Sequence, residues 1–164
     1  MMSHKTILRC CFATLAICVG LVGSAAAGDQ IHFRGSLEGT YTAVPINPPV
    51  FAINLVATGQ ATQVGQFTLD FPHQVDRSVG TAEGDLVITA ANGDTLIAHV
   101  TGQSTPTQVA GIITVVEVAV VTGGTGRFAN ATGTFTIERV LNGITGTTSG
   151  TFQGTISTPG ANIH

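Results

Sequence analysis

The sequence has 164 residues, of which 43% are hydrophobic and 9% charged, and its formal net charge is −3. All three cysteines (Cys10, Cys11 and Cys18) and two of the six basic residues precede residue 28, so residues 28–164 carry four arginines, no lysine and nine acidic residues. This composition excludes disulfides, cysteine nucleophiles and thiolate metal sites from residues 28–164, and it disfavours binding to nucleic acid or to an anionic membrane surface.

The first 27 residues have the pattern of a cleavable signal peptide. A basic start is followed by an uncharged apolar stretch over residues 10–23 and by small residues at positions 24–27. The apolar stretch is shorter than the roughly 20 residues that span a bilayer, which disfavours a transmembrane anchor. We therefore expect cleavage between Ala27 and Gly28, and a secreted or periplasmic protein with a single domain over residues 28–164.

The remaining chain alternates apolar and polar residues with the period of two that is typical of β-strands. Threonine is frequent, and no stretch places apolar residues at helical spacing. Residues 31–41 form the first predicted strand, and three prolines within residues 44–50 predict a loop after it. The other predicted strands cover residues 51–62, 64–75, 86–90, 96–100, 111–122, 134–141 and 147–157.

Short turns connect these strands. Asn92-Gly93 and Asn142-Gly143 are typical of tight hairpins, and further turns are expected at residues 63–65 and 105–107. About eight strands with short connections predict an all-β, up-and-down antiparallel barrel. A two-sheet sandwich is the alternative, but the glycines inside the strands favour a barrel because strongly coiled strands need small residues where they bend. These glycines include Gly35, Gly39, Gly59, Gly84, Gly102 and Gly154.

A membrane-spanning barrel is also exported and also alternates with period two. Such barrels carry aromatic girdles at both interfaces, whereas this sequence has one tyrosine and no tryptophan. We therefore expect no membrane insertion.

Residues 118–133 contain an apolar strand, a glycine-rich turn and a following glycine. Glycines allow a tight reversal with positive φ angles, and Phe128 can fold back to plug one end of a barrel. The residues of the turn are Gly123, Gly124, Thr125, Gly126 and Phe128.

This segment resembles the signature region of the allene oxide cyclase and dirigent superfamily, and it is similar to uncharacterised exported bacterial proteins with threonine-rich barrels. The resemblance implies an eight-stranded barrel, often dimeric or trimeric. It also implies an apolar cavity, which in the plant enzymes holds a reactive lipid epoxide or guides phenoxy radicals. No catalytic residue of the superfamily can be matched by position.

Glu117 interrupts an otherwise apolar strand, so its carboxylate must be paired, protonated or open to water. A symmetric hairpin around residues 123–133 would set Glu117 against Glu138 or Arg139. Alternation favours Arg139, because it shares a face with Phe135 and Ile137. We predict an ion pair between Glu117 and Arg139 on adjacent strands, with either a structural role or a role in substrate contact.

Other candidate groups are few. Tyr41 lies on the apolar face of the first strand, as a core residue or as a proton donor. The histidines His32, His73 and His99 fall on separate strands and are expected to be solvated, because their spacing predicts no metal site. We expect neither a metal nor a cofactor.

Two functions remain open from the sequence. The first is an exported barrel that binds a small apolar molecule or serves as a structural or interaction module. The alternative is a cofactor-free cyclase or isomerase in which Glu117, Arg139 or Tyr41 steers charge during ring closure. The outer side of residues 111–122 is also apolar, and this predicts a homo-oligomer that covers it. The residues on that outer side are Ile112, Val116, Val118 and Val120.

Overall fold

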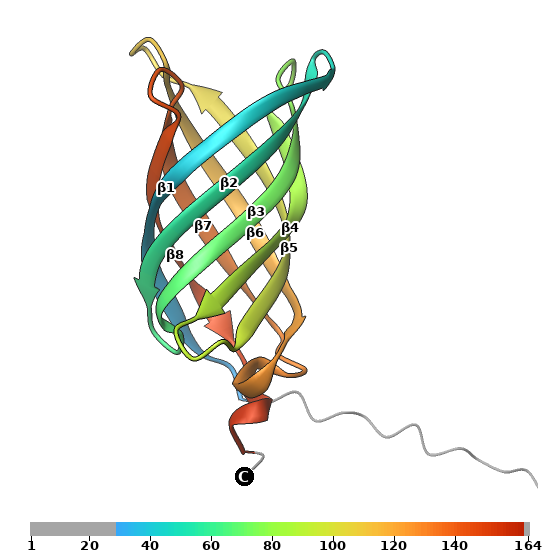
Figure 1. Ribbon diagram of the computed structural model, residues 1–164, viewed down its shortest axis with the longest axis vertical. Coiled ribbons are helices and arrows are strands. Elements are labelled where there is room, and N and C mark those ends of the chain that lie inside the picture. Colours follow the sequence, from blue (N-terminus) through green and yellow to red (C-terminus); the bar gives the residue numbers. More distant parts are fainter. Residues whose placement is uncertain (1–28, 163–164) are drawn as a thin grey trace, which may run out of the picture.

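The computed structural model of the protein describes residues 29–162, and the predicted signal peptide lies outside the described residues. The chain forms a closed barrel of eight strands, each antiparallel to both of its neighbours (Figure 1). The strands follow one another around the barrel in chain order, and β1 pairs with β8 to close it. This confirms the predicted all-β, up-and-down barrel. The strands are β1 (Ile31–Asn47), β2 (Val50–Ala61), β3 (Gly65–Asp76), β4 (Thr81–Ala90), β5 (Thr95–Pro106), β6 (Ile112–Gly124), β7 (Gly133–Asn142) and β8 (Thr147–Ile156).

The first strand is longer than predicted. Residues 44–50 were expected to form a loop, but β1 continues to Asn47 and β2 begins at Val50. Beyond Thr40, β1 pairs with β2 only. Pro45 is tolerated in this part of the strand because one side of the strand makes no backbone hydrogen bonds to a neighbour. The pairing register also shifts between Pro45 and Asn47, where the prolines disturb it.

The two predicted Asn-Gly hairpins differ in detail. Residues 91–94 form a tight turn in which Gly93 has a φ of 90°, as predicted. In the β7–β8 turn, however, the residue with positive φ is Gly146 rather than Gly143. The side-chain oxygen of Asn142 accepts hydrogen bonds from the backbone N–H groups of Ile144 and Thr145, which stabilises a longer turn.

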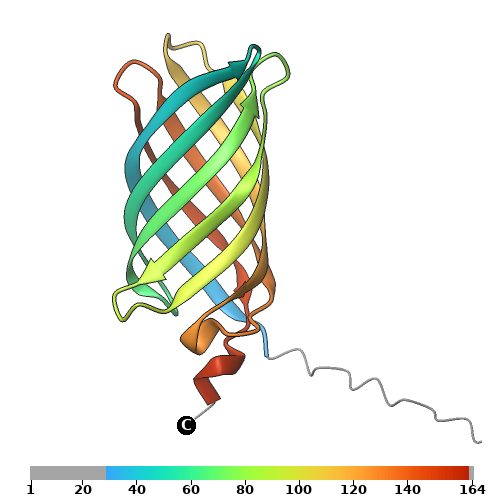
Figure 2. The same ribbon diagram turned by 45° about the vertical axis from the view of Figure 1, so that its right-hand side comes forward.

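The two ends of the barrel are unlike each other (Figures 1 and 2). The open end carries only the four hairpin turns at residues 48–49, 77–80, 107–111 and 143–146. The closed end carries the turns at residues 62–64 and 91–94 and two short 3-10 helices, η1 (Gly126–Phe128) and η2 (Pro159–Asn162). Residues 29 and 162 also lie at the closed end. No helix within residues 29–162 is long and apolar enough to cross a membrane.

Aromatic side chains fill the closed half of the barrel. The ring of Phe33 lies 5.0 Å from the rings of both Phe135 and Phe152, and the last two rings are 5.6 Å apart. Such pairs contribute about 0.5–1.5 kcal/mol each beyond the area that they bury. Phe128 is fully buried at the end of this cluster, which confirms the predicted plug.

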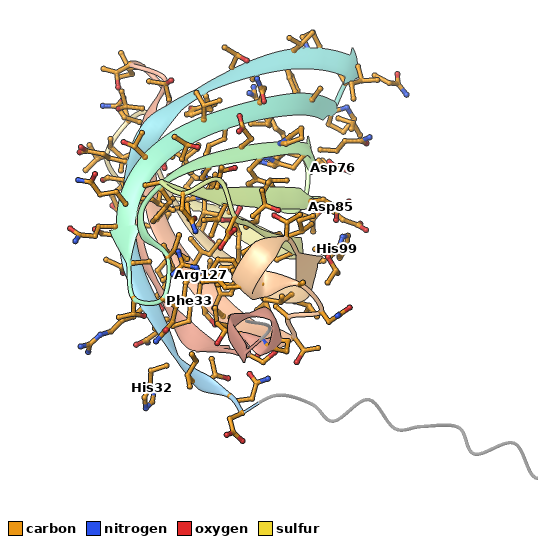
Figure 3. The ribbon with its side chains drawn as sticks, turned by 60° about the horizontal axis from the view of Figure 1, so that its bottom comes forward. His32, Phe33, Asp76, Asp85, His99 and Arg127 are labelled. Carbon is orange, nitrogen blue, oxygen red and sulfur yellow. The ribbon has the colours of Figure 1, made fainter. Side chains whose placement is uncertain are left out.

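An arginine holds the plug against the neighbouring turns. The side chain of Arg127 donates hydrogen bonds to Asp94 at 3.3 Å and to the backbone oxygen of Gln63 at 3.0 Å. Figure 3 labels Arg127, which belongs to η1, at the closed end. Hydrogen bonds from Asn92 and from the backbone of Arg127 lower the pKa of Asp94, which keeps its carboxylate ionised. The glycine-rich turn thus belongs to the structure of the closed end.

Candidate functional site

A cavity of about 850 Å³ occupies the open end of the barrel. Its volume lies within the range of small-molecule pockets. The inward residues of β1, β2, β3, β5, β6 and β7 form its walls, and residues of the open-end turns surround its mouth. The inward lining residues are Tyr41, Ala43, Ile53, His73, Val75, Ser104, Pro106, Ile113, Val115, Arg139 and Leu141.

The inner limit of this cavity is polar. Glu117 of β6 is 1% exposed and Arg139 of β7 is 5% exposed. Arg139 donates two hydrogen bonds to the carboxylate, from Nε to Oε2 at 2.8 Å and from Nη2 to Oε1 at 2.6 Å. This two-pronged geometry confirms the predicted ion pair and leaves a site that is neutral overall.

The register of the pair differs from the prediction. Glu117 lies directly opposite Ile137, and Arg139 lies opposite Val115, so the two charged residues meet diagonally. The strands join through η1 and its flanking residues rather than through a symmetric turn, and this moves the register by two positions. A shift of two preserves the side of the sheet on which a residue lies, which is why the pair still forms.

One nitrogen of Arg139 has no protein partner. Nη1 is buried and makes no hydrogen bond among the described residues. Most buried polar groups in proteins are hydrogen-bonded, and an unpaired one points to a missing partner. Arg139 lines the cavity, so a small movement of its guanidinium would bring Nη1 within reach of a hydrogen-bond acceptor there.

A histidine completes the polar inner limit. His73 of β3 is 7% exposed and its ring stacks on Phe71, with 4.0 Å between the ring centres. The expectation that this histidine is solvated was therefore wrong. Nδ1 lies 2.9 Å from the backbone oxygen of Phe71, and because a carbonyl only accepts, Nδ1 carries the proton.

His73 is held in its neutral form. Burial lowers the pKa of the imidazole most strongly, and the charge of Arg139 lowers it further, while the hydrogen bond to Phe71 and the charge of Glu117 oppose the shift. The neutral ring has an unprotonated Nε2, which accepts hydrogen bonds. Arg139 and His73, which both line the cavity, therefore supply one unused donor and one acceptor at its inner limit.

Each of these three polar side chains lies opposite a glycine on an adjacent strand. A Cβ atom on Gly84 or Gly150 would lie 2.5 Å from the Cβ atom of its partner, and one on Gly102 would collide with its partner's Cγ. Because these glycines have no side chain, they leave room for the large polar side chains opposite them; we call them the glycine sockets. The pairs are Gly84 with His73, Gly102 with Glu117 and Gly150 with Arg139.

Tyr41 lies nearer the mouth. It is half-buried, packs against the apolar core and lines the same cavity as Arg139. Glu117 lies behind Arg139 and does not itself line the cavity. The residues of the glycine-rich turn, by contrast, are at the opposite end of the barrel.

Sequence reasoning missed His73. Its signal is the pairing of an inward polar residue with an in-strand glycine, which becomes visible only when the register between β3 and β4 is known.

A further ionisable cluster lies on the outer wall. His99 of β5 is 2.8 Å from Asp85 and 3.5 Å from Glu83, and Figure 3 shows His99 beside Asp85 on the outside of the barrel. The hydrogen bond with Asp85 raises the pKa of this exposed imidazole. Within residues 29–162, no group of three or more histidine or acidic side chains is arranged to hold a metal ion.

The fold and the site define a class, a closed eight-stranded antiparallel barrel with one packed end and one end hollowed by a cavity. Within that class, the structure is similar to the pterocarpan synthase dirigent protein GePTS1, with a TM-score of 0.57 and 10% sequence identity. The match covers 88% of this chain and 96% of that chain. It confirms the predicted resemblance at the level of the dirigent fold. No protein-family model and no curated protein sequence matches the chain.

Proposed function

We propose that the protein binds a small, largely apolar molecule in the cavity at the open end. The observation that carries this proposal is the unpartnered Nη1 of Arg139 at the inner limit of a cavity of about 850 Å³. Aliphatic side chains on the walls favour an apolar body, while a single buried polar cluster favours one polar group on the ligand.

The charge of the site restricts that polar group. The ion pair cancels the charge of Arg139, and burial keeps His73 neutral. A ligand anion would therefore lose its hydration without meeting a net positive charge. A hydroxyl group suits the site better, because it accepts a hydrogen bond from Arg139 Nη1 and donates one to His73 Nε2.

A cavity-filling substitution tests this proposal. Ala43 of β1 faces the cavity, whereas the adjacent Thr42 is exposed on the outer wall. Ala43→Phe is expected to reduce uptake of the neutral dye Nile red at least tenfold in a fluorescence titration. Thr42→Phe is the matched control and should leave uptake unchanged. Equal dye uptake by the wild-type protein and Ala43→Phe would contradict the proposal.

Native mass spectrometry of the protein purified from its own host identifies the natural ligand. We expect a bound molecule that the Ala43→Phe variant does not retain.

A cofactor-free cyclase or isomerase is the second candidate. It is favoured by the presence of Tyr41 and Arg139 on one cavity, where a phenol and a guanidinium can steer charge on a bound molecule. GePTS1 is described as a pterocarpan synthase, so this fold also occurs in a protein with that role. Chromatography of the recovered ligand after incubation with fresh protein distinguishes the candidates, because only a catalyst converts it to an isomer.

We also propose that the protein is exported, because its first 27 residues have the pattern of a signal peptide. We propose further that copies of the protein assemble through the outer face of β6. Val116, Val118 and Val120 are 45–50% exposed there in the single chain. A second copy that covers this face would remove an apolar stripe from water. Light scattering is expected to give a dimer or trimer, and a monomer at micromolar concentration would contradict this assembly.

A further inference from the structure

The most exposed large apolar side chains of the described chain gather at one end of the barrel. Five of them are 56–78% exposed, and all five lie at or next to the turns of the open end. The other exposed ones, on the barrel wall, reach only 44–50%. The five, which we call the apolar tips, are Val44, Ile46, Val79, Val109 and Ile144.

Every turn of the open end contributes to this ring. Val44 and Ile46 lie near the end of β1, just before the β1–β2 turn, and Val79, Val109 and Ile144 lie within the other three turns. Figures 1 and 2 show these turns together at one end of the barrel. The turns at residues 62–64 and 91–94 of the closed end expose no large apolar side chain. The tips therefore surround the mouth of the cavity and no other part of the described surface.

Hydrogen bonds hold these turns in shape. The hydroxyl oxygen of Thr107 accepts from the backbone N–H of Val109, and Asn142 holds the backbone of Ile144 in the same way. Because the polar groups of these turns bond to one another, the aliphatic side chains remain exposed at the open end. Ile144 is 78% exposed even though it lies beside Gly111 of the adjacent turn.

The open end carries almost no free charge. Its turns and the adjacent strand ends contain one acidic and one basic residue, Asp76 and Arg77. Asp76 accepts hydrogen bonds from the backbone and hydroxyl of Ser78, and Arg77 lies 3.7 Å above the ring of Phe51. A surface that matches this end is therefore electrically neutral, apolar beneath its polar layer, and tolerant of hydroxyl and amide groups.

We propose that the open end docks on the surface of a neutral lipid layer, with the apolar tips at the boundary between headgroups and acyl chains. The apolar tips are separate aliphatic side chains around an opening, and a fluid lipid layer can contact each of them. A stable protein partner would instead need a continuous apolar patch. Val79 and Ile144 also line the cavity, so apolar surface continues from the tips into the barrel. A ligand can then pass from the lipid into the cavity without crossing water. This role of the docking rests on the proposed function, which is ligand binding in the cavity.

Vesicle flotation tests the docking. The wild-type protein is expected to float with vesicles of phosphatidylcholine, and the double variant Val44→Ser, Val109→Ser should lose at least tenfold in its partition coefficient. The matched control is Val56→Ser, Val140→Ser, which removes two exposed valines from the wall outside β6 and should float like the wild type. Circular dichroism establishes that both variants retain the fold.

Three results of the flotation experiment would overturn the docking. These are a wild-type protein that does not float, an equal loss in the wall variant, and binding that appears only with anionic phosphatidylglycerol. A change of oligomeric state in the tip variant, measured by light scattering without lipid, would instead assign the tips to contact between copies and also overturn it.

Dye uptake separates this proposal from the function on which its role rests. In buffer without vesicles, the tip variant should take up Nile red normally, because neither Val44 nor Val109 lines the cavity. Ala43→Phe should lose the dye and still float. If the wild-type protein floats through its tips but binds no dye, the docking stands and the proposed ligand binding fails.

Discussion

The open and closed ends of the barrel are built from the same eight strands but use their side chains differently. At the closed end, aromatic rings meet at 5.0–6.0 Å and a fully buried Phe128 leaves no room for a ligand. At the open end, the inward residues are smaller or polar and surround about 850 Å³ of space. The most distinctive sequence motif lies at the closed end, so in this protein the recognisable segment marks the packed region and not the candidate site.

The largest expected effect concerns the ion pair that separates the two halves. Glu117→Leu leaves the buried Arg139 without its counter-charge and should lower the free energy of unfolding by about 5 kcal/mol, measured by chemical denaturation. The double variant Glu117→Leu, Arg139→Met replaces both charges with apolar groups and should recover most of that loss. A double variant no more stable than the single one would show that the pair itself holds the barrel together.

The aromatic cluster provides the next test. Phe152→Ala at the closed end should lower the free energy of unfolding by about 4 kcal/mol, because it opens a void in a packed core. Leu141→Ala at the open end should lower it by only about 1 kcal/mol, because one side of Leu141 already faces the cavity. Equal losses would mean that the cavity is packed as tightly as the core.

The glycine sockets should give a smaller effect. Gly150→Ala would place a Cβ atom against the backbone oxygen of Glu138 and the Cβ atom of Arg139, so both must move. It should lower the free energy of unfolding by about 2 kcal/mol and weaken dye uptake. Gly143→Ala, in a turn where the nearest atom would be 3.4 Å away, is the control and should be nearly neutral. Unchanged stability and dye uptake in Gly150→Ala would show that an alanine fits at this position without displacing Arg139.

The smallest effect is a dependence on pH. Because the pKa of His73 is lowered in the folded state, the unfolded state binds more protons as the pH falls below about 6.5. The contribution of His73 to stability is therefore complete above that pH and declines below it, until the folded-state pKa is passed. Between pH 7 and pH 5, the free energy of unfolding, measured by chemical denaturation, should fall by more in the wild-type protein than in His73→Gln. The exposed His99, whose pKa is raised, is present in both proteins and cancels in this comparison.

Much of the barrel is predictable from the sequence because period-two alternation depends only on which face of a strand is buried. The ion pair is predictable for the same reason, since Glu117 and Arg139 occupy inward positions of neighbouring strands. The continuation of β1 through Pro45 was missed because it depends on the strand being paired on one side only.

The burial of His73 was missed because it depends on Gly84 of the next strand, and so on a register that composition does not reveal. The cavity could be anticipated only as an implication of the resemblance, because its volume depends on how eight strands fill the space that they enclose.

Residues 29 and 162 both lie at the closed end, opposite the mouth of the cavity (Figure 1). A fusion partner or an affinity tag attached to either side of the described chain therefore begins at the packed end and leaves the cavity accessible. The barrel can be immobilised on a sensor from either terminus with the same orientation, mouth toward solution. The protein is therefore suited to surface display, because the cavity walls and the open-end turns can be mutated without changing the site of attachment.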